Sequence, residues 1–230
     1  MAGVISARLW RVEWILLRGG IKPCLISALD LTGYETVNSG VRAAFKEWAV
    51  VVDALGRGDQ IVVLRKGGIS EGKGGFKMEH DAFWLFPTMY HAQADSVIPS
   101  AVTRWGEIQP LYSDASSLRI EFGARVEQWL RVEDLGVAER LKGQHIWKDQ
   151  VIADRYDWGR EQNIFAIALR VYRLASPVHL PMVPAYGGCK SWIDLESDLS
   201  LEGATPVLAD GAFTSRLESF RKALSPVPAS

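Results

Sequence analysis

Short apolar stretches, each bounded by glycine, proline or charged residues, recur along the chain from about position 38 onward. Runs of this length that are rich in β-branched and aromatic residues are typical of β-strands. The alternation of apolar and polar residues after Ser117 indicates a half-buried strand, with Gly123 as a candidate bulge. The predicted strands are Ile61–Arg65, Phe83–Phe86 (ending at Pro87), Ser117–Val132 and Ile164–Leu174.

Other segments carry apolar residues at the spacing of an α-helix. Asn38 or Ser39 can cap a short helix whose one face carries Val41, Ala44, Phe45 and Trp48. A helix over 133–142, with Leu135, Ala138 and Leu141 inward, would end at Gly143. Residues 213–224 have apolar side chains at helical spacing as well.

The region between the first helix and the glycine-rich segment favours a β-hairpin. Trp48–Leu55 has the composition of a strand, Gly56–Asp59 that of a turn, and Gln60–Arg65 that of the returning strand. Together the elements predict an α+β fold, a bent mixed β-sheet closing toward a barrel with short flanking helices.

Three regions are expected along the chain. Residues 37–224 form a single α+β domain and 225–230 a tail. Residues 1–36 lack the regular pattern, and two interpretations stay open for them. They are either an amphipathic helix or strand packed on the domain, or the product of a translation start assigned too far upstream.

Composition narrows the classes of function. The 26 basic and 27 acidic residues nearly balance, which disfavours a broad basic face for nonspecific duplex binding. Two cysteines in 230 residues argue against a disulfide scaffold and suit a reducing cytoplasm. The sequence has no apolar run of the roughly 18 residues that a membrane span requires, so no membrane partner is expected.

The segment Leu64–His91 carries the densest candidate chemistry. Gly67 and Gly68 follow Arg65 and Lys66 directly, and three more glycines come before Phe76. Glycines that adopt positive φ let backbone N–H groups converge on an anion, beside which the two cations add charge. A long hairpin loop made soluble by lysines is the alternative interpretation. A Walker loop is excluded because the lysine precedes the glycines.

Glu79, His80 and His91 lie at the far end of the same segment. The two histidines are eleven residues apart, which does not match the spacing of a zinc-binding helix, and no metal is expected. Glu79 and His80 are the candidate acid–base residues, and His91 is a candidate ligand contact. If the strands on either side of the glycines are neighbours, Arg65, Lys66, Glu79 and His80 should share one cavity.

A second cluster of aromatic and charged residues lies at 144–159. His145, Trp147, Arg155 and Trp158 are candidate ligand contacts, in which a tryptophan walls a pocket and the arginine supplies charge. The alternative is that both tryptophans belong to the core. Arg170, in the strand that follows, either faces the same cavity or is solvated.

Several of these segments together resemble a known family. They are FKEWAVVVDAL, GDQIVVLRKGGI and EHDAFWLFPT (from Phe45 to Thr88), then His91, HIW, ALRVYRLASPV and YGGCKSW (ending at Trp192). The family is bacterial and cyanobacterial and is catalogued as domain of unknown function 1802. The resemblance covers roughly Val41 to Phe220. It brings no established activity or catalytic residue. Some members occur beside restriction-endonuclease-type domains, which implies a link to DNA handling or defence and a nuclease as partner.

The elements and the tail LRVYRLASPVHL are also similar to barrels of the PUA, ASCH and EVE kind. That resemblance implies recognition of RNA or modified DNA bases in an aromatic cleft, although a fold does not determine a function. We therefore expect a cytoplasmic binding module for a nucleotide, a modified base or a single-stranded nucleic acid, without a cofactor. One alternative is a small enzyme acting on a phosphorylated or nucleotide substrate, and another is a protein-interaction domain.

Overall fold

The computed structural model describes residues 12–17, 20–25, 41–66, 76–159 and 161–225. Contacts divide the chain into two units, Met1–Asn38 and Ser39–Ser230. In the first unit β1 (Val12–Leu17) pairs antiparallel with β2 (Gly20–Leu25). The second unit contains all the other elements.

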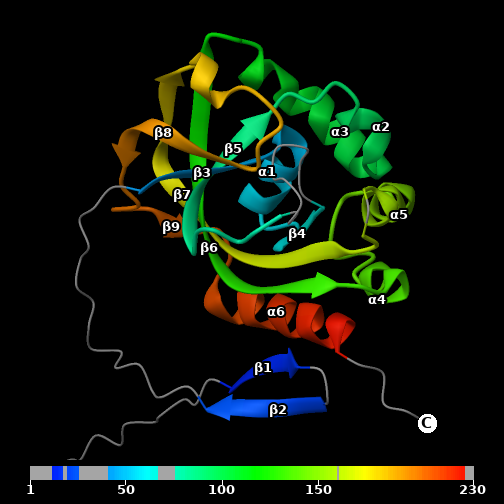
Figure 1. Ribbon diagram of the computed structural model, residues 1–230. Coiled ribbons are helices and arrows are strands. Elements are labelled where there is room, and N and C mark those ends of the chain that lie inside the picture. Colours follow the sequence, from blue (N-terminus) through cyan, green and yellow to red (C-terminus); the bar gives the residue numbers. More distant parts are fainter. Residues whose placement is uncertain (1–11, 18–19, 26–40, 67–75, 160, 226–230) are drawn as a thin grey trace, which may run out of the picture. The chain divides into compact units, whose positions relative to one another are not determined.

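The second unit is built on one seven-stranded sheet (Figure 1). Its strands follow the order β4-β7-β6-β5-β3-β8, and β9 pairs with β7. β3 and β5 are parallel, whereas every other pair is antiparallel. The predicted α+β class with a mixed sheet is confirmed, and the sheet stays open between β4 and β8. The bounds are β3 Val41–Trp48, β4 Val62–Arg65, β5 Ala82–Thr88, β6 Ser117–Val132, β7 Ile164–Pro181, β8 Trp192–Leu199 and β9 Thr205–Pro206.

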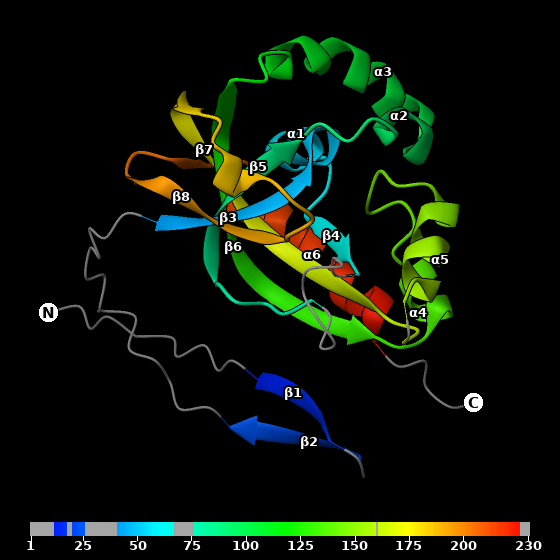
Figure 2. The same cartoon turned by 45° about the horizontal axis from the view of Figure 1, so that its top comes forward.

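Short helices surround the sheet. Figures 1 and 2 show α6 lying along the long strands β6 and β7, and α3 and α5 beyond the strand ends. The predicted helix at 213–224 is confirmed within α6, and the one after Glu133 is confirmed in shortened form as α4. The helices are α1 Ala49–Gly56, α2 Gln93–Ser96, α3 Pro99–Ile108, α4 Leu135–Glu139, α5 Asp149–Asp157 and α6 Asp210–Leu224, with 3-10 turns η2 Gln109–Tyr112 and η3 Pro184–Tyr186.

The prediction for 38–55 was wrong, because helix and strand are exchanged. Residues 41–48 form strand β3, and 49–56 form helix α1. Ala44 and Phe45 are both buried although they point to opposite faces of the sheet, so the strand lacks simple alternation. The helix is apolar nearly all round, and its valines were mistaken for a strand. Burial on every side removes the periodicity that separates the two structures.

The predicted hairpin over 48–65 was wrong because its first arm, 49–56, is helix α1. The expectation that the strands flanking the glycine-rich segment are neighbours was wrong as well. β4 pairs with β7, and β5 lies between β6 and β3. The strands on either side of the glycine-rich segment are therefore not neighbours. Gly58 does form the predicted turn, with a φ of 73°.

The two long strands match their predictions more closely. β6 has the predicted bounds, but its register shifts at Ile120/Phe122 and at Val126/Gln128, not at Gly123. Gly123 is instead needed for close packing, because a Cβ there would lie 2.5 Å from the Leu201 side chain. β7 continues past the predicted end and through two prolines.

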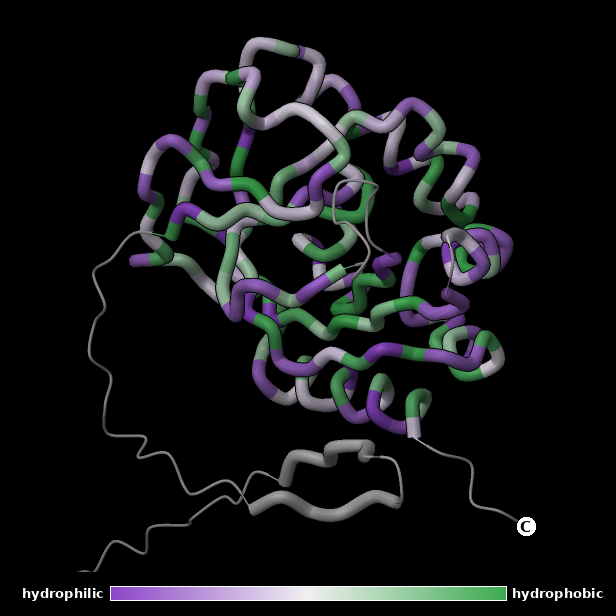
Figure 3. The backbone as a smooth tube through the Cα atoms, in the orientation of Figure 1, coloured by the Kyte–Doolittle hydropathy of each residue, from purple (hydrophilic) through white to green (hydrophobic). Residues whose placement is uncertain are grey.

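Two groups of buried side chains hold the domain together. The larger lies between the sheet and the helices and includes the apolar residues of α1, β4 and β7. In Figure 3 the middle of the domain accordingly carries much of the hydrophobic colour. The smaller group lies on the other face of β3 and β5 and consists of Ala44, Trp84, Phe86, Leu118, Ile120, Tyr186, Ile193 and Leu195.

Two helical glycines provide a test of this packing. A Cβ on Gly56 would lie 2.2 Å from the Phe122 ring, whereas a Cβ on Gly106 would meet nothing within 4 Å. We expect Gly56→Ala to lower the free energy of unfolding by about 1–3 kcal/mol through overpacking. Gly106→Ala should raise it by about 0.5–1 kcal/mol because alanine is the better helix former. Urea unfolding of both variants measures this, and equal effects would contradict the packing of Phe122.

Candidate functional site

Arg155 is held between two tryptophan rings at the end of the sheet. Its guanidinium carbon lies 4.7 Å from the centre of the Trp48 ring and 4.9 Å from that of Trp147. Nη1 donates a hydrogen bond to the carbonyl of Leu64 at 2.8 Å. Helix α5 carries Arg155, and Trp48 is the last residue of β3. Stacking on two indoles, together with the main-chain contact, fixes the guanidinium plane.

Arg65 lies at the end of β4 and connects it to the residue before β8. Its Nε and Nη2 donate to the Ser191 hydroxyl at 3.1 and 2.8 Å. Nη1 lies 3.7 Å from Oε2 of Glu47, and the guanidinium lies 5.2 Å from the centre of the Phe45 ring. A single arginine thus contacts residues at both ends of the strand order.

Glu47 is 1% exposed. Its Oε1 accepts a hydrogen bond from the Trp48 backbone at 2.8 Å. Among the described residues Oε2 has no hydrogen-bond partner, although Arg65 is nearby. A buried carboxylate is costly unless it is paired with opposite charge, and here the two arginines provide that charge.

These neighbouring groups form what we call the Arg155 cluster: Arg155, Trp48, Trp147, Arg65, Glu47 and Ser191. The pKa of Arg155 is lowered to about 10, chiefly by burial; Arg65 acts in the same direction, while Glu47 and Tyr90 act in the opposite direction. Burial also lowers the pKa of Lys46, the residue before Glu47, and Arg65 again adds to the effect. A cation that lowers the pKa of neighbouring cations indicates that positive charge is concentrated in this region.

An exposed aromatic pair borders this cluster. The Tyr90 ring stacks on Trp48 with centroids 5.1 Å apart and an interplanar angle of 21°. Tyr90 is 42% exposed, so its ring remains available on the solvent side. His91 packs against Tyr90 at 4.8 Å. The structure therefore brings the predicted residues Arg65, Arg155, Trp147 and His91 around one cluster.

Lys66 lies beside the cluster, but its donors are occupied. Nζ donates to the carbonyls of Tyr156 at 2.9 Å and Asn163 at 2.8 Å, and also to that of Glu161. An ammonium has three N–H donors, so these carbonyls use them all. The hydrogen bonds of Lys66 connect α5 to the residues just before β7.

The other predicted residues are dispersed. His80 packs edge-on against Trp192 at 5.1 Å, and Glu79 is exposed. Trp158 is exposed at the end of α5. Gly67 and Gly68 lie outside the described residues. The expectation that Lys66 and His80 share a cavity rested on neighbouring strands, and that pairing is absent.

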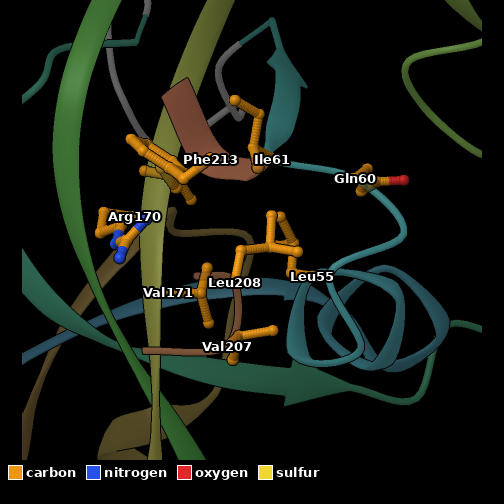
Figure 4. Close-up of a pocket in the computed structure, with 9 residues that line it drawn as sticks. Leu55, Gln60, Ile61, Arg170, Val171, Val207, Leu208 and Phe213 are labelled. Carbon is orange, nitrogen blue, oxygen red and sulfur yellow. The ribbon is translucent and has the colours of Figure 1, made fainter. Parts of the chain in front are cut away.

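Arg170 belongs to a separate structural contact. Its guanidinium lies 4.5 Å from the centre of the Phe213 ring and pairs with Asp210 at 2.5 Å. The adjoining cavity, shown in Figure 4, has a volume of only about 10 Å³. Such a space holds about one water molecule. Arg170 therefore joins β7 to α6, away from the Arg155 cluster.

A family model described as "Domain of unknown function (DUF1802)" matches residues 44–219. The chain belongs to this family. The match spans all the residues of the Arg155 cluster. No curated protein matches the chain.

Solved structures similar to this DUF1802 chain include ASCH from Zymomonas mobilis and two of its point mutants. The TM-scores are 0.38 to 0.40 and the identities 13–14%. Each similarity covers 77% of this chain and 93–96% of the other.

Sequence analysis did not identify four residues at or beside the Arg155 cluster of this DUF1802 chain: Glu47, Trp48, Tyr90 and Ser191. Glu47 left one signal, a carboxylate next to a long buried run, which buried charges seldom occupy without a partner. Trp48 was read as core, and Tyr90 and Ser191 carry no pattern of their own.

No group of three His, Cys, Asp or Glu side chains in the described ranges could hold a metal ion. Within the same part of the chain, no helix is both long and apolar enough to cross a membrane.

His145 supports the cluster from behind Trp147. Their rings are 5.6 Å apart, and His145 is 7% exposed. Among the described residues its Nδ1 has no hydrogen-bond partner. Burial lowers the pKa of His145 to about 4; Arg155 lowers it as well, while Asp149 acts in the opposite direction. The imidazole is therefore neutral at pH 7.

This lowered pKa predicts acid sensitivity. The unfolded chain binds a proton at His145 near the ordinary pKa of 6.5, whereas the folded chain resists protonation down to about 4. Stability should therefore fall as the pH drops through this window, by up to about 3 kcal/mol. His145→Gln, which cannot be protonated, should lose less stability over the same window. Melting temperatures at a series of pH values test this, and parallel curves for the two proteins would contradict it.

Proposed function

We propose that the Arg155 cluster binds the phosphate of a nucleotide or of a single-stranded nucleic acid, and that Tyr90 stacks on its base. One observation supports this most directly. Two arginines, Arg65 and Arg155, lie at the site against the single carboxylate of Glu47. Buried or half-buried charge that its own chain leaves unbalanced favours an ion of opposite sign.

Arg155 is the group we expect to contact phosphate. A guanidinium has five N–H donors, and within the described part of the chain Arg155 uses one, toward Leu64. The side chain is only partly buried, and its plane is fixed by Trp48 and Trp147. A rigidly held guanidinium with unused N–H donors suits bidentate contacts to phosphate and loses little entropy on binding.

The base would lie against Tyr90. Its ring already stacks on Trp48, and the Arg155 guanidinium lies over the Trp48 ring, so the three groups form a continuous stack. An exposed aromatic ring next to cations is the usual arrangement for holding a base without reading its sequence. The balanced charge of the whole chain fits a local site of this kind better than a broad nucleic-acid face.

The wider role is proposed on the family resemblance alone. It comprises a link to DNA restriction or defence and a nuclease as partner, whereas a cytoplasmic location is proposed from the low cysteine content.

The test compares two aromatic-stacked arginines by titration calorimetry with thymidine monophosphate and a thymidine octanucleotide. Arg155→Lys should weaken binding by about 1–3 kcal/mol, because lysine keeps the charge but loses the fork. Arg170→Lys is the matched control and should bind as the unaltered protein does. Equal affinity in both variants, or no binding by the unaltered protein, would refute the proposal.

Glu47→Gln separates the two roles of the carboxylate. Among the described residues it removes the one carboxylate paired with these arginines, so the free energy of unfolding should fall by about 3–5 kcal/mol at most. Affinity for thymidine monophosphate should rise, because the net positive charge at the site increases. Weaker binding would show that Glu47 contacts the ligand. Turnover of the nucleotide by the unaltered protein, lost in this variant, would favour the enzyme alternative.

A further inference from the structure

A row of cations and aromatic rings extends from the Arg155 cluster across the sheet. Arg65 of β4 is paired with Phe165 of β7, which in turn is paired with Arg131 of β6. Residues directly opposite one another on neighbouring strands point to the same face. Trp129 is two residues before Arg131 on the same strand, so it shares this face.

This face is the one that α6 leaves uncovered. Gln128, which alternates with Trp129 along β6, accepts a hydrogen bond from Arg221 of α6 at 2.9 Å. α6 therefore lies against the opposite face. Inward from Trp129 the rings of Phe165, Phe76 and Trp192 follow one another with centroid distances of 6.0, 5.4 and 6.2 Å.

Trp129 is the open end of this series. It is 45% exposed, whereas Phe165 and Phe76 are buried. Among the described residues, the β6 segment of Gln128 to Val132 pairs with β7 alone, whereas β5 pairs with β6 only at 123–125. The indole is tilted by 43° to the Phe165 ring, and its exposed part is open to a ligand that stacks.

We infer that Trp129 is a second stacking position, and that the partner is a single-stranded nucleic acid several nucleotides long. The inference rests on the proposed function of the Arg155 cluster. From strand spacing and rise, the Cα atoms of Trp129 and Arg65 are roughly 12 Å apart. A stacked single strand advances about 3.4 Å per nucleotide. A strand whose phosphate lies at Arg65 and Arg155 therefore reaches Trp129 within about four nucleotides.

The charges around Trp129 favour contact through a base and not through phosphate. Arg131 forms ion pairs with Glu161 at 2.7 Å and with Glu133 at 3.2 Å. Two carboxylates around one guanidinium leave no positive charge to attract a phosphate. The Trp129 contact is thus a stacking contact, and the salt dependence of binding originates at the Arg155 cluster.

The experiment measures affinity against strand length. Thymidine monophosphate and thymidine strands of two, four and eight residues are titrated into the full chain and into two variants, Trp129→Ala and Trp158→Ala. Both tryptophans are about half exposed, but Trp158 lies outside the row, so it is the matched control. The unaltered protein should bind the four- and eight-residue strands more tightly than the monophosphate.

Trp129→Ala should lower affinity for the longer strands by about 5- to 100-fold, the loss of one stacked base. It should leave binding of the monophosphate unchanged, and Trp129→Phe should restore most of the loss. Trp158→Ala should behave as the unaltered protein.

Three outcomes would overturn the inference by itself. Monophosphate binding without any gain in longer strands would do so while leaving the proposed function intact. Equal losses in the two tryptophan variants would do so as well. A concentration-dependent dimer in sedimentation that Trp129→Ala abolishes would assign this ring to a second copy of the chain. Absence of binding by every probe would instead refute the proposed function, and the inference with it.

Discussion

The contact on which this domain most depends is the one that Arg65 makes across the open sheet. β4 and β8 are the last strands at either end of the order and do not pair with each other. Arg65 spans that interval with two hydrogen bonds to Ser191 and one ionic contact to Glu47. This contact is made by side chains and not by a ladder of main-chain hydrogen bonds. It also places the positive charge of Arg65 between the two edge strands, where a closed sheet would have uncharged amide groups. That charge is part of the candidate site.

The charge balance at the seam then follows from burial. Glu47 is enclosed, so it stabilises the fold only while cations remain close. Arg65 and Arg155 both serve this purpose, and together they exceed what one carboxylate neutralises. Burial lowers the pKa of Arg155 and of Lys46, and the local excess of positive charge contributed by Arg65 acts in the same direction. An anion bound here would relieve that excess, so binding and folding stability should increase together.

Sequence reasoning succeeded where one physical signal dominated. β6 and α6 were predicted because each has one solvent-exposed and one buried face. β4 was predicted because a short apolar run ends at charged residues. It failed at 41–56, where burial on all sides erased the periodicity. At the site it found Arg65, Arg155 and Trp147, which stand out as charge or aromatic density. Glu47 and Tyr90 depend on the parallel pairing of β3 with β5. That long-range contact is not encoded in any local pattern.

The two stacked arginines show how one local device serves different purposes. Arg170 and Arg155 each lie less than 5 Å from the centre of an aromatic ring. Arg170 pairs with Asp210 beside a cavity with room for about one water, so the chain supplies its counter-charge, although Nη1 has no hydrogen-bond partner among the described residues. Arg155 shares Glu47 with a second arginine, has one hydrogen bond among the described residues, and stands beside a half-exposed tyrosine. Stacking alone distinguishes neither role. The difference lies in whether the chain supplies the counter-charge, and at Arg155 a ligand phosphate would supply what the chain lacks.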